Sequence, residues 1–175
     1  MLTIYLTSVI ESNTGSSPEA LELYLAKIVE KDTQALADLY RSTNAAVYAF
    51  ALSILKNPHD AEDALHDCYV QIFANAASYH AAGKPMAWIM TITRNLCMQK
   101  FRERRKSSDI PQEDWDRYLD AQEDASQEDR LVLRECLQQL TDDERQIVTL
   151  HAVNGFKHRE IAELLQLPLP TVLSK

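Results

Sequence analysis

The chain has 175 residues, of which 46% are hydrophobic and 25% are charged, proportions typical of a globular protein of one or two domains. Three glycines and six prolines leave little turn material for an all-β fold, whereas residues that favour helices are abundant. The composition therefore predicts an all-α protein and excludes a disordered chain.

The net charge of −8 is distributed unevenly along the chain. Residues 84–106 carry seven basic groups and one acidic group, whereas residues 1–83 and 107–129 have net charges of −6 and −8. Residues 130–175 are balanced. A phosphate backbone responds to the local field, so the acidic average does not exclude nucleic-acid binding by the basic block.

Cys68, Cys97 and Cys136 are an odd number of cysteines at unrelated spacings, which predicts neither a disulfide framework nor a zinc site. No run of about 18 apolar residues occurs, and no basic segment precedes the apolar first ten residues, so we expect no membrane insertion and no signal peptide. No Gly-rich phosphate loop or Ser/His/Asp set is present. We therefore expect a cytoplasmic protein with no catalytic residues, no metal and no cofactor.

Residues 1–18 end in turn-forming residues and predict a flexible N-terminal segment. Apolar residues recur at helical spacing over residues 19–106 and predict one helical domain, with turn residues at 56–59 and 82–85. Its four helices are expected near residues 19–30, 33–55, 60–75 and 85–104.

Residues 107–127 combine turn residues with an acidic stretch that contains one basic residue, Arg117. Repulsion between the carboxylates keeps such a segment extended, so it predicts an acidic tether. The tether is expected to join the first domain to a second one over residues 128–175.

The second domain has the order of a helix-turn-helix. Thr141 and Glu144 form a capping box that begins a helix, and Gly155 ends it. An apolar segment at 161–165 and a turn with two prolines then lead to a new helix start at Thr171, as in DNA-binding motifs. An ordinary helical hairpin also fits this segment taken alone.

The helix expected at 60–75 has an apolar face and an acidic face. The apolar stripe is Ala61, Leu65, Cys68, Tyr69, Ile72 and Phe73. The outward residues are Asp60, Glu62, Asp63, His66, Asp67 and Gln71. Asp60 is placed to cap the helix, and acidic residues in a first turn complement the helix dipole. The acidic face is therefore either a stable solvated helix start or a docking surface for a basic helical partner.

The helix expected at 85–104 concentrates its cations towards its C-terminal end. They are Arg94, Lys100, Arg102, Arg104, Arg105 and Lys106, whereas Trp88, Ile92 and Leu96 form a packing stripe. Some cations suit the helix dipole, but six in thirteen positions exceed that need and are typical of a phosphate-tracking surface. The preceding loop, residues 76–84, either is an ordinary loop or receives an unstacked base on its aromatic residue.

Three segments in this order resemble the extracytoplasmic-function group of the sigma-70 family, over about residues 20–175. Residues 55–73 are similar to the family's core-binding helix, residues 83–106 to its −10 reading segment, and residues 137–172 to its −35 reading domain. The resemblance implies a transcription initiation factor, not an enzyme, that binds core RNA polymerase and directs it to −10 and −35 promoter elements.

The resemblance also implies partners and functional residues. The clamp coiled coil of the largest polymerase subunit would contact Asp60, Glu62, Asp63, His66, Asp67 and Gln71. The −10 element would contact Ser78, Tyr79, His80, Lys84, Arg94, Asn95, Lys100, Arg102, Arg104 and Arg105. The −35 element would contact Lys157, His158, Arg159, Thr171, Ser174 and Lys175. An anti-sigma factor is a further partner, and the acidic tether would thread towards the RNA exit path.

Several positions depart from the family's usual residues. Lys157 replaces a capping Ser or Thr, which predicts a weaker helix start, and Pro170 replaces Gly, although proline suits a first helical turn. Leu173 and Gln99 replace a basic and an acidic residue. The chain ends at Lys175, about one turn into the expected recognition helix, and such a stub is too short to hold a helix by itself. We therefore expect weak −35 recognition by this chain.

Two other functions fit parts of the pattern. A stand-alone helix-turn-helix regulator would bind duplex DNA tightly without polymerase, in a salt-sensitive manner. A truncated sigma factor would act only as a polymerase-binding module. The sigma interpretation predicts weak DNA binding until core polymerase is present.

Overall fold

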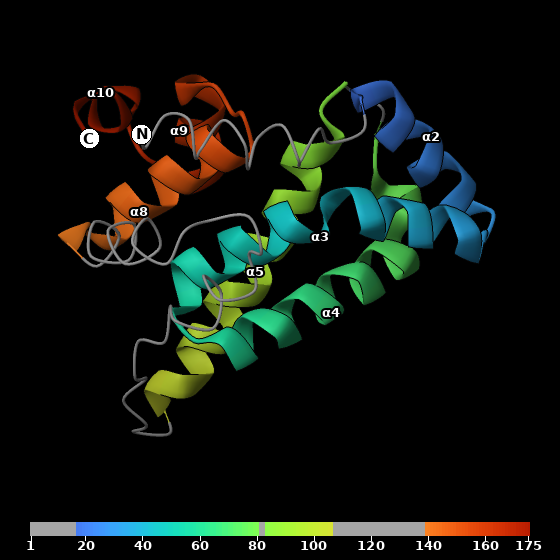
Figure 1. The fold of residues 1–175 in the computed structure, drawn as a ribbon, viewed down its shortest axis with the longest axis horizontal. Helices are drawn as coiled ribbons and strands as arrows, with labels where there is room; N and C mark the ends of the chain where they lie inside the picture. The colour runs from blue at the N-terminus through green and yellow to red at the C-terminus, as the bar shows by residue number, and fades with distance from the viewer. Residues whose placement is uncertain (1–16, 81–82, 107–138) are drawn as a thin grey trace, which may run out of the picture.

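The computed structural model describes residues 17–80, 83–106 and 139–175, without the side chains of 104–106. Every regular element in these ranges is a helix (Figure 1), so the predicted all-α class is confirmed for them. The expected acidic tether and most of the expected N-terminal segment lie outside the described residues.

The first four α-helices begin and end within two residues of the expected positions. They are α2 (Pro18–Val29), α3 (Thr33–Leu55), α4 (Pro58–Asn75) and α5 (Pro85–Lys106). Side-chain caps explain the starts: the Ser17 hydroxyl accepts a hydrogen bond from the backbone N–H of Ala20 (3.3 Å). Asp32 accepts one from the N–H of Gln34 (2.8 Å). Such bonds satisfy donors that have no partner within the helix.

The start of α4 differs from the expectation. The cap is Asn57, whose side-chain oxygen accepts a hydrogen bond from the backbone N–H of Asp60 (3.1 Å). The prediction that Asp60 caps this helix was therefore wrong. Pro58 occupies the first helical turn, where its fixed φ suits the helix and its missing N–H costs nothing. Lys56, with φ of 54°, ends α3 in the left-handed conformation.

Helix α3 is central to the first unit, which comprises α2–α5, and packs against the other three helices (Figure 1). Leu39, Val47 and Phe50 of α3 are fully buried. One buried polar contact joins α3 to α4, in which the Thr43 and Tyr69 hydroxyls lie 2.7 Å apart. The apolar stripe predicted for α4 is buried except for Phe73, which is partly buried.

The two described cysteines are free and buried. Burial raises the pKa of the Cys68 thiol to about 11 and that of Cys97 to about 12. Because the thiolate is the reactive form, both groups are chemically inert at neutral pH. Cys136 lies outside the described residues.

The C-terminal unit is built from short elements. They are α8 (Asp142–Val148), the π-helix η2 (Thr149–Val153), α9 (His158–Leu165) and α10 (Leu169–Ser174). The predicted capping box is confirmed: the Glu144 carboxylate accepts from the N–H of Thr141 (2.8 Å), and the Thr141 hydroxyl accepts from the N–H of Glu144 (3.5 Å). The sequence pattern did not predict the π-helix.

The C-terminal unit packs on the first unit. Helices α8 and η2 contact α3, and α9 contacts α5 (Figure 1). Buried residues of both units belong to one hydrophobic cluster. Within the described ranges, no helix is both long and apolar enough to cross a membrane.

Candidate protein and nucleic-acid interfaces

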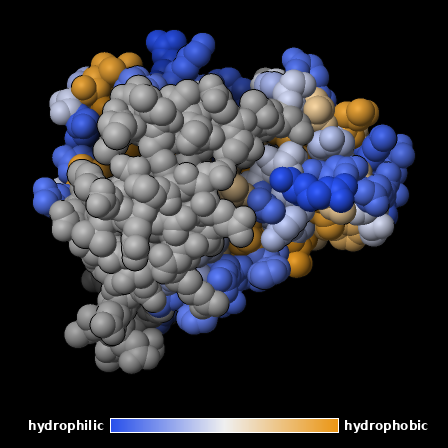
Figure 2. All heavy atoms as spheres, viewed as in Figure 1, coloured by the Kyte–Doolittle hydropathy of each residue, from blue (hydrophilic) through white to orange (hydrophobic). Residues whose placement is uncertain are grey.

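One long side of α4 carries the acidic face, defined here as Asp60, Glu62, Asp63, His66, Asp67 and Gln71. The Asp63 and Asp67 side chains are 67% and 54% exposed, and His66 and Gln71 are exposed as well. Figure 2 shows mostly hydrophilic surface along the part of the lower edge that grey atoms do not cover, near the place of α4 in Figure 1. The helix therefore presents carboxylates to solvent while its opposite side fills the core.

The first turn of the acidic face is less open than its middle. Asp60 and Glu62 are half-buried. The His66 ring is held on the helix surface, because its Nδ1 atom lies 2.9 Å from the backbone oxygen of Glu62. Asp63 and Asp67, one turn apart, are thus the most accessible carboxylates of the face.

The segment before α5 holds three of the expected DNA-binding residues. Ala76–Ser78 form a short 3-10 helix, η1, where the sequence predicted a loop. Ser78 and His80 are exposed and Tyr79 is half-buried, with its ring centroid 5.4 Å from that of Trp88. An aromatic pair at the surface beside exposed polar groups is suited to stacking a nucleic-acid base.

Glu22 of α2 shapes this segment, and sequence reasoning missed it. One oxygen of its carboxylate, Oε1, accepts hydrogen bonds from the Tyr79 hydroxyl (2.9 Å) and the Gly83 N–H (2.9 Å). Gly83 has a φ of 68°, which glycine adopts at little cost. No local pattern marks Glu22, because it lies about 60 residues away in the chain.

The expected DNA-binding residues of α5 have different surroundings. Asn95 and Arg102 are exposed, whereas Lys100 lies 3.5 Å from Asp63 and 3.6 Å from Asp67. Arg94 donates from Nη2 to the backbone oxygen of Leu165 (3.4 Å) in α9. The side chains of Arg104 and Arg105 lie outside the described part of the structure.

Lys84, the residue before α5, also faces the C-terminal unit. Its ammonium lies 3.4 Å from the Glu160 carboxylate. Two residues expected to contact the −10 element, Lys84 and Arg94, are therefore engaged by α9.

The helix-turn-helix residues are mostly accessible. Lys157, Arg159 and Ser174 are exposed, His158 and Thr171 are half-buried, and the Lys175 ammonium lies 3.8 Å from the Asp143 carboxylate. The Lys157 side chain makes no capping hydrogen bond, so the weaker helix start stays a prediction. Half of a capping box remains, because Glu160 accepts a hydrogen bond from the N–H of Lys157 (3.0 Å). In the described ranges no group of three or more His, Cys, Asp or Glu residues is placed to hold a metal ion.

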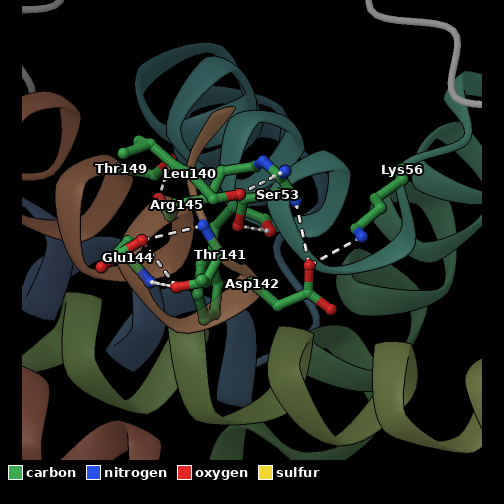
Figure 3. Close-up of polar contacts among 9 residues, drawn as sticks. Ser53, Lys56, Leu140, Thr141, Asp142, Glu144, Arg145 and Thr149 are labelled. Atoms are coloured by element: carbon green, nitrogen blue, oxygen red, sulfur yellow. Dashed lines mark hydrogen bonds and ion pairs between the residues drawn. The ribbon is translucent and has the colours of Figure 1, made fainter. Parts of the chain in front are cut away.

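Figure 3 shows a polar network where α8 meets the end of α3. Asp142 lies 2.7 Å from Lys56 Nζ and 3.2 Å from Arg145 Nη1. Arg145, only 2% exposed, also donates to the backbone oxygen of Leu140 (2.9 Å). Burial opposes ionisation of Asp142, but its hydrogen bond to Lys56 and the charges of Lys56 and Arg145 outweigh burial and lower its pKa. Sequence reasoning also missed the buried role of Arg145.

The contact between the units combines apolar packing with polar groups, and some of the polar groups have no partner among the described residues. Asn154 donates from Nδ2 to the Met90 sulfur (3.5 Å). The Asn154 Oδ1 and Arg94 Nε atoms are buried and have no hydrogen-bond partner among the described residues. Such atoms each cost about 1–3 kcal/mol while they stay without a partner.

Comparison with known proteins places this architecture in a family. Residues 39–107 match the family model described as Sigma-70 region 2, and residues 130–175 match Sigma-70, region 4. The ECF RNA polymerase sigma factor SigK of Mycobacterium sp. (strain KMS) is 27% identical over 162 residues, which cover 89% of this chain and 84% of SigK. SigK of Mycobacterium bovis (strain BCG / Pasteur 1173P2) is 25% identical, with coverage of 89% and 87%.

Two solved structures share the fold. CnrH, solved in complex with the cytosolic domain of CnrY, has a TM-score of 0.60 at 19% identity, covering 89% of this chain and 88% of that one. The sigma factor RpoE of Bartonella quintana, solved with the anti-sigma factor NepR, has a TM-score of 0.62 at 23% identity, covering 77% and 85%. Together with the two region matches, these relatives show that the chain belongs to the extracytoplasmic-function sigma factors of the sigma-70 family, which direct RNA polymerase to promoters.

Proposed function

We propose that the acidic face of α4 docks this sigma factor on the clamp coiled coil of the largest polymerase subunit. The observation that carries the proposal is the exposure of Asp63 and Asp67, one helical turn apart on a rigid helix. Two basic side chains one turn apart on a partner helix have the same spacing as these two carboxylates, so both pairs of charges could meet. In this assignment residues 19–106 form the core-binding and −10 domain.

The exposed part of α5 and the segment before it are proposed to read the −10 element. Asn95 and Arg102 are open to solvent, and Arg104 and Arg105 continue the basic run in the sequence. Ser78, Tyr79 and His80 would hold an unstacked base beside Trp88. The arginines of α5 would bind DNA phosphates, and residues 78–80 would select the base.

The described packing of the two units is proposed to be the form that the free protein adopts. Lys84 and Arg94 reach the −10 element only when α9 moves away from them. Polymerase would stabilise the separated form if it binds each unit at a different place. DNA binding by the free chain is then weak, which distinguishes it from a stand-alone regulator.

Further assignments follow from the family. Residues 128–175 would contact the −35 element through Lys157, His158, Arg159, Thr171, Ser174 and Lys175. The acidic linker at 107–127 would thread towards the RNA exit path. Because CnrH and RpoE were solved with CnrY and the anti-sigma factor NepR, an anti-sigma factor is proposed as regulator. We also propose a cytoplasmic location.

The docking proposal is tested by titrating the full chain against bacterial core RNA polymerase. Asp63→Arg should weaken binding at least tenfold, because charge reversal at a complementary interface adds repulsion to the lost attraction. The matched control is Glu30→Arg, an exposed residue at the end of α2, which should bind as the parent does. Equal affinity of a folded Asp63→Arg variant would refute docking through this face.

A further inference from the structure

Lys100 connects the acidic face of α4 to the basic end of α5. Its ammonium lies 3.5 Å from the Asp63 carboxylate and 3.6 Å from that of Asp67. Figure 1 shows the C-terminal half of α5 beside the N-terminal half of α4. A residue expected from sequence to contact DNA therefore neutralises the two most accessible carboxylates of the proposed docking face.

The burial of the three side chains indicates which of them are free to meet another protein. Lys100 is 23% exposed, against 67% for Asp63 and 54% for Asp67. The carboxylates thus project beyond the ammonium that holds them, and an incoming cation can approach their open side. The two ion pairs are long and near the surface, where such pairs contribute little to stability. An external cation can replace them at low cost.

We propose that Lys100 is an internal competitor for the docking carboxylates and sets the affinity of this sigma factor for polymerase. The inference rests on the proposed docking function of α4. In the free chain Lys100 occupies Asp63 and Asp67; in the complex, basic groups of polymerase take its place and its ammonium is released. The released cation lies on the same helix as Asn95 and Arg102, so docking adds a positive charge to the proposed promoter surface.

Thermodynamic linkage gives this exchange a consequence for DNA binding. If docking frees Lys100 for phosphate, phosphate binding by Lys100 must in turn favour docking by the same factor. The ion pairs therefore couple the two proposed interfaces through one side chain, without any change of fold.

The test measures the affinity of core polymerase for the full chain carrying Lys100→Gln. Removing the competitor should tighten binding about two- to fivefold, the range expected for surface ion pairs. The matched control is Lys27→Gln, which removes the same charge from an exposed position of α2 and should leave the affinity unchanged. Thermal unfolding of each variant verifies the fold.

A double-mutant cycle separates this inference from the docking proposal. In an Asp63→Asn, Asp67→Asn background, Lys100→Gln should no longer tighten binding, because no carboxylate remains to compete for. If Asp63→Arg weakens docking but Lys100→Gln leaves it unchanged or weaker, Lys100 is no competitor and only the present inference is overturned. If Asp63→Arg has no effect, the docking face itself is wrongly assigned.

Release of the ammonium has its own readout. Acetylation by a small amine-reactive reagent, quantified by mass spectrometry, should modify Lys100 faster in the polymerase complex than in the free chain. Lys27 serves as the internal reference. Slower modification of Lys100 in the complex would overturn the release step.

Discussion

The two units of this sigma factor are stabilised in different ways. The first unit surrounds the 23-residue helix α3 with three other helices and buries large side chains such as Leu39 and Phe50. The C-terminal unit has α-helices of only seven, eight and six residues. Helices this short do not persist alone. The C-terminal unit therefore depends on the packing of these helices on one another and on its polar network around Arg145.

This difference in stabilisation matters for function, because the C-terminal unit, which has the shorter helices, is the one proposed to move. The large core of the first unit holds α4 and α5 in fixed positions. The proposed docking face of α4 and the proposed promoter surface of α5 both require this. The small unit, with unsatisfied polar atoms at its contact, is the part that we propose to separate. The predictions below test this contrast, from the largest expected effect to the smallest.

Phe50→Ala should lower the free energy of unfolding of the first unit by about 3–5 kcal/mol, because it leaves a cavity beneath fully buried neighbours. Chemical denaturation followed by circular dichroism measures the loss. Leu23→Ala, at a position 54% exposed, should change it by less than about 0.5 kcal/mol. Equal effects of the two substitutions would contradict the assignment of the core.

Arg145→Ala should destabilise the C-terminal unit by about 1–3 kcal/mol, because it removes a buried side chain together with its hydrogen bonds to Asp142 and Leu140. Hydrogen exchange should show faster exchange in α8 and α9 while the amides of α3 stay protected. The exposed Arg159 provides the matched control through Arg159→Ala. Loss of protection throughout α3 would mean that the first unit is not independent.

Thr141→Ala should cost the C-terminal unit about 1 kcal/mol, the usual contribution of a helix cap. Hydrogen exchange in α8 reports this change. Thr91→Ala removes a hydroxyl that bonds only within α5, to the backbone oxygen of Ala87, and should leave α8 unaffected. Equal hydrogen exchange in α8 for Thr141→Ala and Thr91→Ala would mean that the Thr141 cap does not stabilise this helix.

Acid should weaken the junction between Lys56 and Asp142. Because the folded protein lowers the pKa of Asp142, the stabilisation is present above the ordinary value of 3.8 and is lost as the pH falls below it. The effect is small, since the Asp142 side chain is 61% exposed. Hydrogen exchange of α8 at falling pH measures it, and Asp142→Asn should remove this part of the pH dependence.

Sequence alone predicted the helices well because their ends carry local signals. The Thr141 box and the apolar stripe of α4 are patterns within one element, and the structure confirms both. Asn57 was missed as a cap because the acidic first turn drew the assignment to Asp60, three residues later. The π-helix η2 has no comparable local signal.

The surroundings of the candidate site were harder to predict. A helical pattern shows which face a residue occupies but not which helix lies opposite. The pairing of Lys100 with Asp63 and Asp67, and the engagement of Lys84 by Glu160, depend on how separate helices pack. Glu22 was missed for the same reason. The roles of these residues in polymerase and promoter binding stay predictions.

The distance between the two units tests the account most directly. Fluorescent labels on Ala26→Cys in α2 and Val148→Cys in α8, both exposed positions, would report it by energy transfer, with Cys136→Ser to keep labelling specific. The buried thiols of Cys68 and Cys97 should react slowly. We predict high transfer in the free chain and a clear fall when core polymerase is added. Low transfer in the free chain, or unchanged transfer on binding, would contradict a closed form that polymerase opens.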